Sequence, residues 1–126
     1  MSCVNVYVHI VFGSKYRKPV LTKDLLQKVC LHIKENGEKK NLGIIMVNGY
    51  QDHIHCLLKL HNELSVSETA RLIKGESAHW INKNQLTSHR FSWQGEYWAN
   101  SISQTQLSRV KRYILNQQAK HKNPGL

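Results

Sequence analysis

The sequence has few of the residues that mark linkers, secreted scaffolds or membrane spans. Its 126 residues include two prolines, Pro19 and Pro124, and no tract rich in proline, glycine and serine, so nothing indicates an interdomain linker. No segment approaches the roughly 20 apolar residues that a membrane-spanning helix needs. No internal repeat is present. We therefore expect one domain over residues 1–126 and no membrane partner.

Cysteine and acidic residues are also scarce. The three cysteines, Cys3, Cys30 and Cys56, are odd in number and far apart, and the first residues lack the pattern of a secretory signal. We therefore expect a reducing, cytoplasmic location. Asp and Glu number 8 against 18 Lys and Arg, which gives a formal net charge of +10. Such a surface attracts polyanions, and nucleic acid is the leading partner.

The first half of the sequence predicts three strands and one helix. Apolar and polar residues alternate over residues 4–12, as in a strand with one buried face. Thr22 is the expected N-cap of a helix that ends near Gly37, because apolar residues recur at helical spacing between them. Residues 42–47 and 53–60 are rich in β-formers. The turn residues between them, Asn48-Gly49 and Gln51-Asp52, predict a hairpin without fixing its turn.

The second half predicts two helices and one strand. Ser65 and Glu68 form a capping box for a helix with Val66, Ala70, Ile73, Ser77 and Trp80 along one side. A fourth strand is expected within residues 91–102. A second capping box, Ser103 to Gln106, precedes a helix that runs to about Lys120. The order β-α-β-β-α-β-α predicts an α+β fold, a ferredoxin-like or RRM-like antiparallel sheet with both crossover helices on one face and the other face open.

Two histidines lie one residue apart in the third predicted strand, which we expect to be central in the sheet together with the first. Because side chains alternate along a strand, His53 and His55 point to one face while Ile54 and Cys56 point to the other, apolar face. The histidine face is then the open one, and His9 of the first strand can line it. Two such imidazoles can share a cation, or they can be ordinary solvated or hydrogen-bonded residues.

The last predicted helix carries a hydroxyl and an amide on the same side. Tyr113 and Gln117 are four residues apart and therefore stacked on one helical face. Val110 and Ile114 can hold this helix on the protein. In isolation, Tyr113 also suits a tyrosine at the edge of the core with an ordinary hydrogen bond.

Taken together, these features resemble the single-tyrosine transposases of the HUH endonuclease superfamily. The resemblance covers most of the chain. It includes "YVHIVFGSKYRKPVL", "QDHIHCLL", "LIKGESAHWIN", "FSWQ" and "VKRYILNQ". Insertion-sequence transposases and REP-associated tyrosine transposases share these features, so the resemblance does not separate a mobile-element enzyme from a host-encoded one.

The resemblance implies a role for each residue of the histidine and tyrosine motifs. His53, His55 and Gln117 match the metal ligands, for which Mg²⁺ or Mn²⁺ is the expected ion, and Tyr113 matches the nucleophile. Attack by Tyr113 on a DNA phosphate would leave a 5′-phosphotyrosine and a free 3′-hydroxyl, followed by strand transfer. The sequence does not identify the base that deprotonates the tyrosine, and Asp52, His9 and bulk water are the alternatives.

The resemblance also implies single-stranded DNA, recognised through small hairpins, and a homodimer in which the tyrosine helix of one subunit completes the histidine site of the other. The candidate DNA contacts are Lys15, Tyr16, Arg17, Lys18, Arg71, Lys74, Arg109, Lys111 and Arg112. Trp93 and Trp98 are further stacking candidates, whereas Trp80 fits the core better. The competing interpretations are a noncatalytic nucleic-acid-binding module and a small metal-binding interaction protein.

Overall fold

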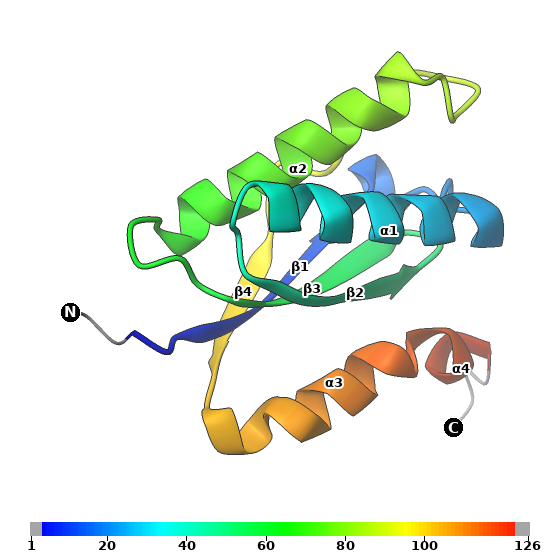
Figure 1. Cartoon of the computed structure of the whole chain (residues 1–126). Helices are drawn as coiled ribbons and strands as arrows, with labels where there is room; N and C mark the ends of the chain where they lie inside the picture. Colours follow the sequence, from blue (N-terminus) through cyan, green and yellow to red (C-terminus); the bar gives the residue numbers. More distant parts are fainter. Residues whose placement is uncertain (1–3, 123–126) are drawn as a thin grey trace.

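The structure is a computed structural model that describes residues 4–122. These residues form a four-stranded antiparallel sheet with helices on both faces (Figure 1). The elements are β1 (Tyr7–Gly13), η1 (Lys15–Arg17), α1 (Lys23–Lys39), β2 (Ile44–Tyr50), β3 (His53–Lys59), α2 (Val66–Lys83), β4 (Trp98–Ile102), η2 (Gln104–Gln106), α3 (Leu107–Leu115) and α4 (Gln117–Lys122). The strand order β2-β3-β1-β4 places β1 and β3 in the centre, which confirms the predicted α+β sheet. Cys3 and Pro124 lie outside the described residues.

The main core lies between the sheet and the helices α1 and α2. Val8, Ile10 and Phe12 of β1 and Ile54 and Cys56 of β3 are buried there, as the alternation predicts. Both helices begin at the predicted caps. The Thr22 hydroxyl accepts a hydrogen bond from the Leu25 backbone N–H, and Ser65 and Glu68 form the expected capping box. None of the helices within residues 4–122 is both long and apolar enough to cross a membrane.

The opposite face of the sheet is covered, and the expectation of an open face is wrong. The helices α3 and α4 lie on this face, across the sheet from α1 and α2 (Figure 1). Leu57 of β3 and Ile114 of α3 are both fully buried and are not part of the main core cluster. The Asn48 side-chain amide donates hydrogen bonds to the carbonyl oxygens of Ile114 and Leu115, at 2.9 and 3.3 Å. A small second core therefore holds the C-terminal helices against β2 and β3.

Two predicted strand boundaries differ from the structure. The first strand starts at Tyr7 rather than at residue 4, and Val4 and Val6 are each 40% exposed. Asn48 and Gly49 lie within β2, so Gln51 and Asp52 alone form the turn to β3. A Cβ atom on Gly49 would lie 2.2 Å from the His53 carbonyl oxygen. Glycine is therefore needed here for close strand pairing rather than for a turn.

The predicted last helix is broken. The helix α3 ends at Leu115, its C-cap Asn116 has φ −94° and ψ 16°, and α4 begins at Gln117. The prediction that Tyr113 and Gln117 share one helix is therefore wrong. The Gln117 side-chain amide still donates a hydrogen bond to the Tyr113 carbonyl oxygen, at 3.3 Å. This contact holds the two residues together across the break.

Candidate active site

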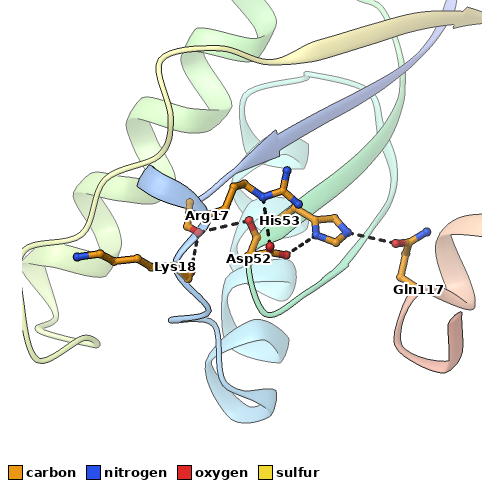
Figure 2. A network of polar contacts seen from close by, with 6 residues as sticks. Arg17, Lys18, Asp52, His53 and Gln117 are labelled. Atoms are coloured by element: carbon orange, nitrogen blue, oxygen red, sulfur yellow. Dashed lines mark hydrogen bonds and ion pairs between the residues drawn. The ribbon is translucent and has the colours of Figure 1, made fainter. Parts of the chain in front are cut away.

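His53 is held from behind by a carboxylate. The turn residue Asp52 places Oδ1 2.7 Å from His53 Nδ1, and Arg17 Nε donates to Asp52 Oδ2 at 3.2 Å (Figure 2). Burial opposes the ionisation of Asp52, but the hydrogen bonds from His53 and Arg17 outweigh it and keep its pKa below the ordinary value. An ionised carboxylate can only accept, so His53 donates from Nδ1 and, in the neutral ring, carries its lone pair on Nε2.

The Nε2 atom of His53 faces another acceptor. Gln117 is 1% exposed, and its Oε1 lies 3.2 Å from His53 Nε2 (Figure 2). The amide orientation is set by the hydrogen bond that Gln117 donates to the Tyr113 carbonyl oxygen. Two lone pairs that face each other repel unless a proton or a cation lies between them.

The spacing of these two atoms suits a metal ion. Two ligands at right angles, each about 2.1 Å from an octahedral ion, lie about 3 Å apart. The distance from His53 Nε2 to Gln117 Oε1 is 3.2 Å. Within residues 4–122, no three His, Cys, Asp or Glu side chains converge on a common metal position. Imidazole nitrogens and the Gln117 amide oxygen are the donors that would hold a divalent cation here, and their spacing fits one.

His55 lies beside His53, and a third histidine supports it. The ring centres of His53 and His55 are 5.0 Å apart. On the other side, Nε2 of His9 in β1 lies 2.8 Å from Nδ1 of His55. Burial lowers the pKa of His9, which is therefore neutral at pH 7. When His55 is the donor in this contact, its lone pair is on Nε2, the tautomer that a metal ligand needs.

Tyr113 lies over the histidine face and reaches solvent. Its ring centre is 5.7 Å from that of His55 and 6.3 Å from that of His9, and the residue is 43% exposed. Of the side chains considered as its base, His9 is the one whose ring contacts it, whereas both oxygens of Asp52 bind His53 and Arg17. A partly exposed tyrosine beside buried histidines is an arrangement that suits attack on a bound phosphate.

The structure brings the predicted site residues together but buries the histidines. His53 and His55 are 6% and 5% exposed, so the expectation that they lie on an outer surface is wrong. The physical reason is the docking of α3 and α4 over them. Replacing either histidine by alanine would therefore also leave space beneath these helices.

The candidate DNA contacts occupy three separate places. Lys15, Tyr16, Arg17 and Lys18 lie together at η1. Arg71 and Lys74 lie on α2, and Arg109, Lys111 and Arg112 lie on α3, across the sheet from α2 (Figure 1). These basic residues therefore do not form one surface.

Some of the aromatic residues predicted to stack on bases are exposed, and others are buried. Tyr16 and Trp98 are 75% and 49% exposed, so both can meet a base. Trp93 is 8% exposed and donates from Nε1 to the Ser77 hydroxyl, at 3.0 Å, so its prediction as a stacking residue is wrong. Trp80 stacks on His32 with ring centres 4.0 Å apart.

Sequence reasoning missed two supporting roles. Asp52 was a candidate base, and its hydrogen bond to His53 depends on the tight turn that joins β2 to β3. Its position directly before the histidine pair was the available signal. The residue types of Asn48 and Gly49 predicted a turn, and no sequence pattern indicates that the Asn48 amide binds the end of α3.

Comparison with known proteins agrees with this arrangement. The family model "Transposase IS200 like" matches residues 2–117, which include both histidines, Tyr113 and Gln117. The transposase for insertion sequence element IS200 of Salmonella typhimurium is 30% identical over 95 residues, covering 75% of this chain and 62% of the relative. The chain therefore spans less than two thirds of that relative's length. The ISDra2 transposase TnpA of Deinococcus radiodurans is 22% identical over 117 residues, covering 89% of this chain and 84% of the relative.

Solved structures share the fold. A protein of Deinococcus radiodurans R1 described as a transposase superposes with a TM-score of 0.72 at 19% identity, covering 92% of this chain and 93% of that one. A REP-associated tyrosine transposase, solved bound to a REP hairpin, superposes with a TM-score of 0.61 at 19% identity, covering 96% of this chain and 71% of that one. With a family model matched over residues 2–117 and this fold beneath it, the chain belongs to the IS200-like transposase family.

Proposed function

We propose that this protein cuts single-stranded DNA with Tyr113 and joins the strand to a new 3′ end, in a reaction that uses Mg²⁺ or Mn²⁺. The observation that carries the proposal is the position of Tyr113. Its ring lies 5.7 Å from that of His55, and Gln117, just past the helix break, contacts His53. A nucleophile and a ligand set thus meet on one face of the sheet. Family membership supports the same chemistry.

The chain supplies a ligand set and holds it in place. His53, His55 and Gln117 would bind the ion, while Asp52 and His9 fix the orientation of the two imidazoles. When bound, a divalent ion supplies Lewis acidity to a non-bridging phosphate oxygen. Neutral ligands leave most of the positive charge of such an ion for that phosphate. The buried setting excludes water around the imidazoles and strengthens these interactions.

Cleavage transfers the DNA phosphate from a 3′ oxygen to Tyr113. The tyrosine loses its phenolic proton to a base, and its oxygen attacks phosphorus. The bond from phosphorus to the 3′ oxygen breaks, and that oxygen takes up a proton as the 3′-hydroxyl. A 5′-phosphotyrosine is left, and attack by another 3′-hydroxyl reverses the step and releases Tyr113. We assign the proton to water, because the one acceptor nitrogen of neutral His9, although its ring lies beside that of Tyr113, already binds His55.

The substrate we propose is single-stranded DNA that carries a small hairpin. The REP-associated relative is bound to a REP hairpin in its structure. The charge of +10 on this chain provides the electrostatic attraction that such a substrate needs.

The first test is covalent capture. The protein is mixed with a 5′-labelled and a 3′-labelled hairpin oligonucleotide and Mn²⁺, and adducts are separated under denaturing conditions. We expect an adduct with the 3′-labelled strand, because the tyrosine retains the 5′ phosphate. Tyr113→Phe should lose the adduct completely and keep hairpin affinity within about twofold, since it removes one oxygen from an exposed side chain. An adduct of wild-type yield in Tyr113→Phe would reassign the nucleophile, and binding without any wild-type adduct would favour a noncatalytic DNA-binding module.

The second test concerns the metal site. Because His55 is buried, His55→Gln fills more of its space than alanine and limits the packing loss. We expect this variant and Gln117→Leu to lose Mn²⁺ binding measured by paramagnetic resonance, while circular dichroism stays that of the wild type. Wild-type Mn²⁺ binding in both variants would exclude these ligands.

We also propose that the protein is a homodimer in which α3 and α4 are exchanged between subunits. In the described chain these helices rest on their own sheet, and an exchanged pair would make the same contacts. Mixing Tyr113→Phe with His53→Ala subunits tests exchange, because one site of an exchanged heterodimer has intact histidines and an intact tyrosine. Recovered adduct formation supports exchange, whereas purified heterodimers without activity show that each subunit completes its own site.

A further inference from the structure

A groove runs between η1 and the segment of residues 86–92, outside the site described above. Two adjoining hollows form it, and both are lined by Lys18, Arg90 and Phe91. Its walls are joined by the backbone. The Lys15 N–H donates to the Ser92 carbonyl oxygen at 3.1 Å, and an isolated β-bridge links Ser14 to Trp93. The groove therefore has a fixed base rather than being a gap between loose segments.

The lining of this groove carries positive charge without acidic partners. Lys15, Lys18 and Arg90 line it, and no Asp or Glu does so among the residues that the structure describes. Within residues 4–122, these three cations make no ion pair. All three are exposed. Cations that nothing neutralises and that line one channel suit a phosphate backbone.

Tyr16 offers a stacking surface at the same place. It lines the groove and is 75% exposed, and its backbone is left-handed, with φ 60° and ψ 18°. An aromatic residue rarely adopts this conformation, and local strain of this kind is kept where the surroundings impose it. The Nζ atoms of Lys15 and Lys18 lie 5.5 and 5.9 Å from the ring centre. An exposed ring with cations beside it is an arrangement with which proteins bind single-stranded nucleic acid.

The groove is connected to the candidate active site through the next residue. Arg17 follows Tyr16 and donates to Asp52, which in turn holds His53 (Figure 2). The Ser14 N–H donates to the Asp52 carbonyl oxygen at 2.9 Å. The η1 segment thus lies between the groove and the turn that carries Asp52. A strand in the groove would therefore lie next to the support of the metal-binding histidines.

We propose that this groove binds a single-stranded stretch of the DNA substrate, with phosphates on Lys15, Lys18 and Arg90 and one unpaired base on Tyr16. This inference rests on the proposed function, since it assigns a second contact to the same substrate. The proposal distinguishes η1 from the other basic DNA-contact candidates, which lie on α2 and α3. The duplex stem of a hairpin lacks the unstacked base that Tyr16 is placed to receive.

The test uses two fluorescent hairpins that differ in one feature, a single-stranded thymidine tail. Binding is measured by anisotropy across a salt series for wild type, Lys18→Gln, Arg90→Gln and Tyr16→Asn. Asparagine removes the ring and tolerates the left-handed backbone at residue 16. Tyr16→Trp tests rescue of stacking, and Lys39→Gln at the exposed end of α1 is the control for loss of one charge.

Each lysine or arginine variant should lower the salt slope for the tailed hairpin by about 0.7, the value for one phosphate of a single strand. Tyr16→Asn should weaken binding of the tailed hairpin about 5- to 150-fold and Tyr16→Trp should restore it. The blunt hairpin and Lys39→Gln should show neither change. If all three variants bind the tailed hairpin like the wild type, the proposal is overturned. Equal losses of affinity for the tailed and the blunt hairpin also overturn it, because they would assign the groove to duplex DNA. Adduct formation by Tyr113 is measured separately. If the groove binds the tail but no adduct forms, the proposed cleavage fails. If the adduct forms but the groove variants bind normally, the groove proposal fails.

Discussion

Ile114→Ala should release the C-terminal helices from the sheet without unfolding the rest of the protein. Ile114 is fully buried and is the one α3 side chain that is buried among the residues that the structure describes. The substitution removes three carbon atoms, which is about 2.4 kcal/mol of transfer free energy at roughly 0.8 kcal/mol each. Together with the cavity left behind, substitutions of this kind cost about 2 to 5 kcal/mol, and the transfer free energy lies near the lower end of this range.

This cost should fall on local opening because α3 and α4 are held on the sheet by contacts of their own with β2 and β3. The main ones are the hydrogen bonds from Asn48 to the end of α3 and the contact of Gln117 with His53. The main core between the sheet, α1 and α2 does not include Ile114. A loss of 2 to 5 kcal/mol raises the open population of the C-terminal helices by about 30-fold to more than 1,000-fold, at about 1.4 kcal/mol per factor of ten.

Hydrogen exchange followed by mass spectrometry measures this opening segment by segment. In Ile114→Ala, exchange should accelerate over residues 107–119 and stay unchanged in β1, β3 and α2, while adduct formation falls because Tyr113 and Gln117 leave the histidines. Leu115→Ala is the matched control, since its neighbouring side chain is 64% exposed and its truncation should change stability by about 0.5 kcal/mol or less. Uniform acceleration of exchange over the whole sheet would refute the reasoning, because it would show that the two cores open as one unit.

Three further predictions concern single contacts. Asp52→Asn should weaken Mn²⁺ binding about 10- to 100-fold, because it removes the carboxylate that orients His53. Glu68→Gln should be less stable than the wild type at pH 7, and this difference in the free energy of unfolding should shrink as the pH falls. The backbone hydrogen bond of the capping box lowers the Glu68 pKa below its ordinary 4.5, so the charge stabilises the fold above that pH and ceases to do so as the pH falls through the folded value. Gly43→Ala should cost about 2 kcal/mol or more, since φ is +70° and the new Cβ would lie 2.1 Å from the Lys59 carbonyl oxygen.

Each of these has a direct check. Mn²⁺ titration of Asp52→Asn at wild-type affinity would show that the carboxylate does not tune the site. Urea unfolding of Glu68→Gln between pH 7 and pH 3 should give curves that converge with wild type, and a constant offset would contradict the assignment to charge. For Gly43→Ala the control is Gly75→Ala, where the new Cβ meets nothing within 4 Å and a mid-helix alanine should stabilise by about 0.5 to 1 kcal/mol. Equal effects of the two glycine substitutions would contradict the argument from backbone conformation.

Side-chain alternation predicted the faces of the sheet correctly because burial of one face fixes the register of a strand. It placed Ile54 and Cys56 in the core and His53 and His55 together on the other face. It could not predict that this other face would be covered. The helix α3 is strongly amphipathic, but the spacing of its apolar residues shows which side is buried and not which surface that side packs against.

The parts of the site that sequence did not predict depend on contacts between distant residues. The contact of His9 with His55 arises from pairing of β1 with β3, and the contact of Arg17 with Asp52 arises because η1 folds back on the turn. The break at Asn116 also lacked a signal. An i to i+4 spacing of Tyr113 and Gln117 fits a continuous helix as well as it fits the observed pair of short ones.

The two-residue turn between β2 and β3 limits which insertions and deletions the chain can accept. Its carbonyl groups are both bound, that of Gln51 by the Leu21 N–H and that of Asp52 by the Ser14 N–H, each at 2.9 Å. An added residue here would shift β3 by one position and turn both histidines into the main core. The loop of residues 84–90, which is largely exposed, has no such coupling to the strands. The length of the turn before His53 should therefore stay fixed, because an insertion there moves both histidines.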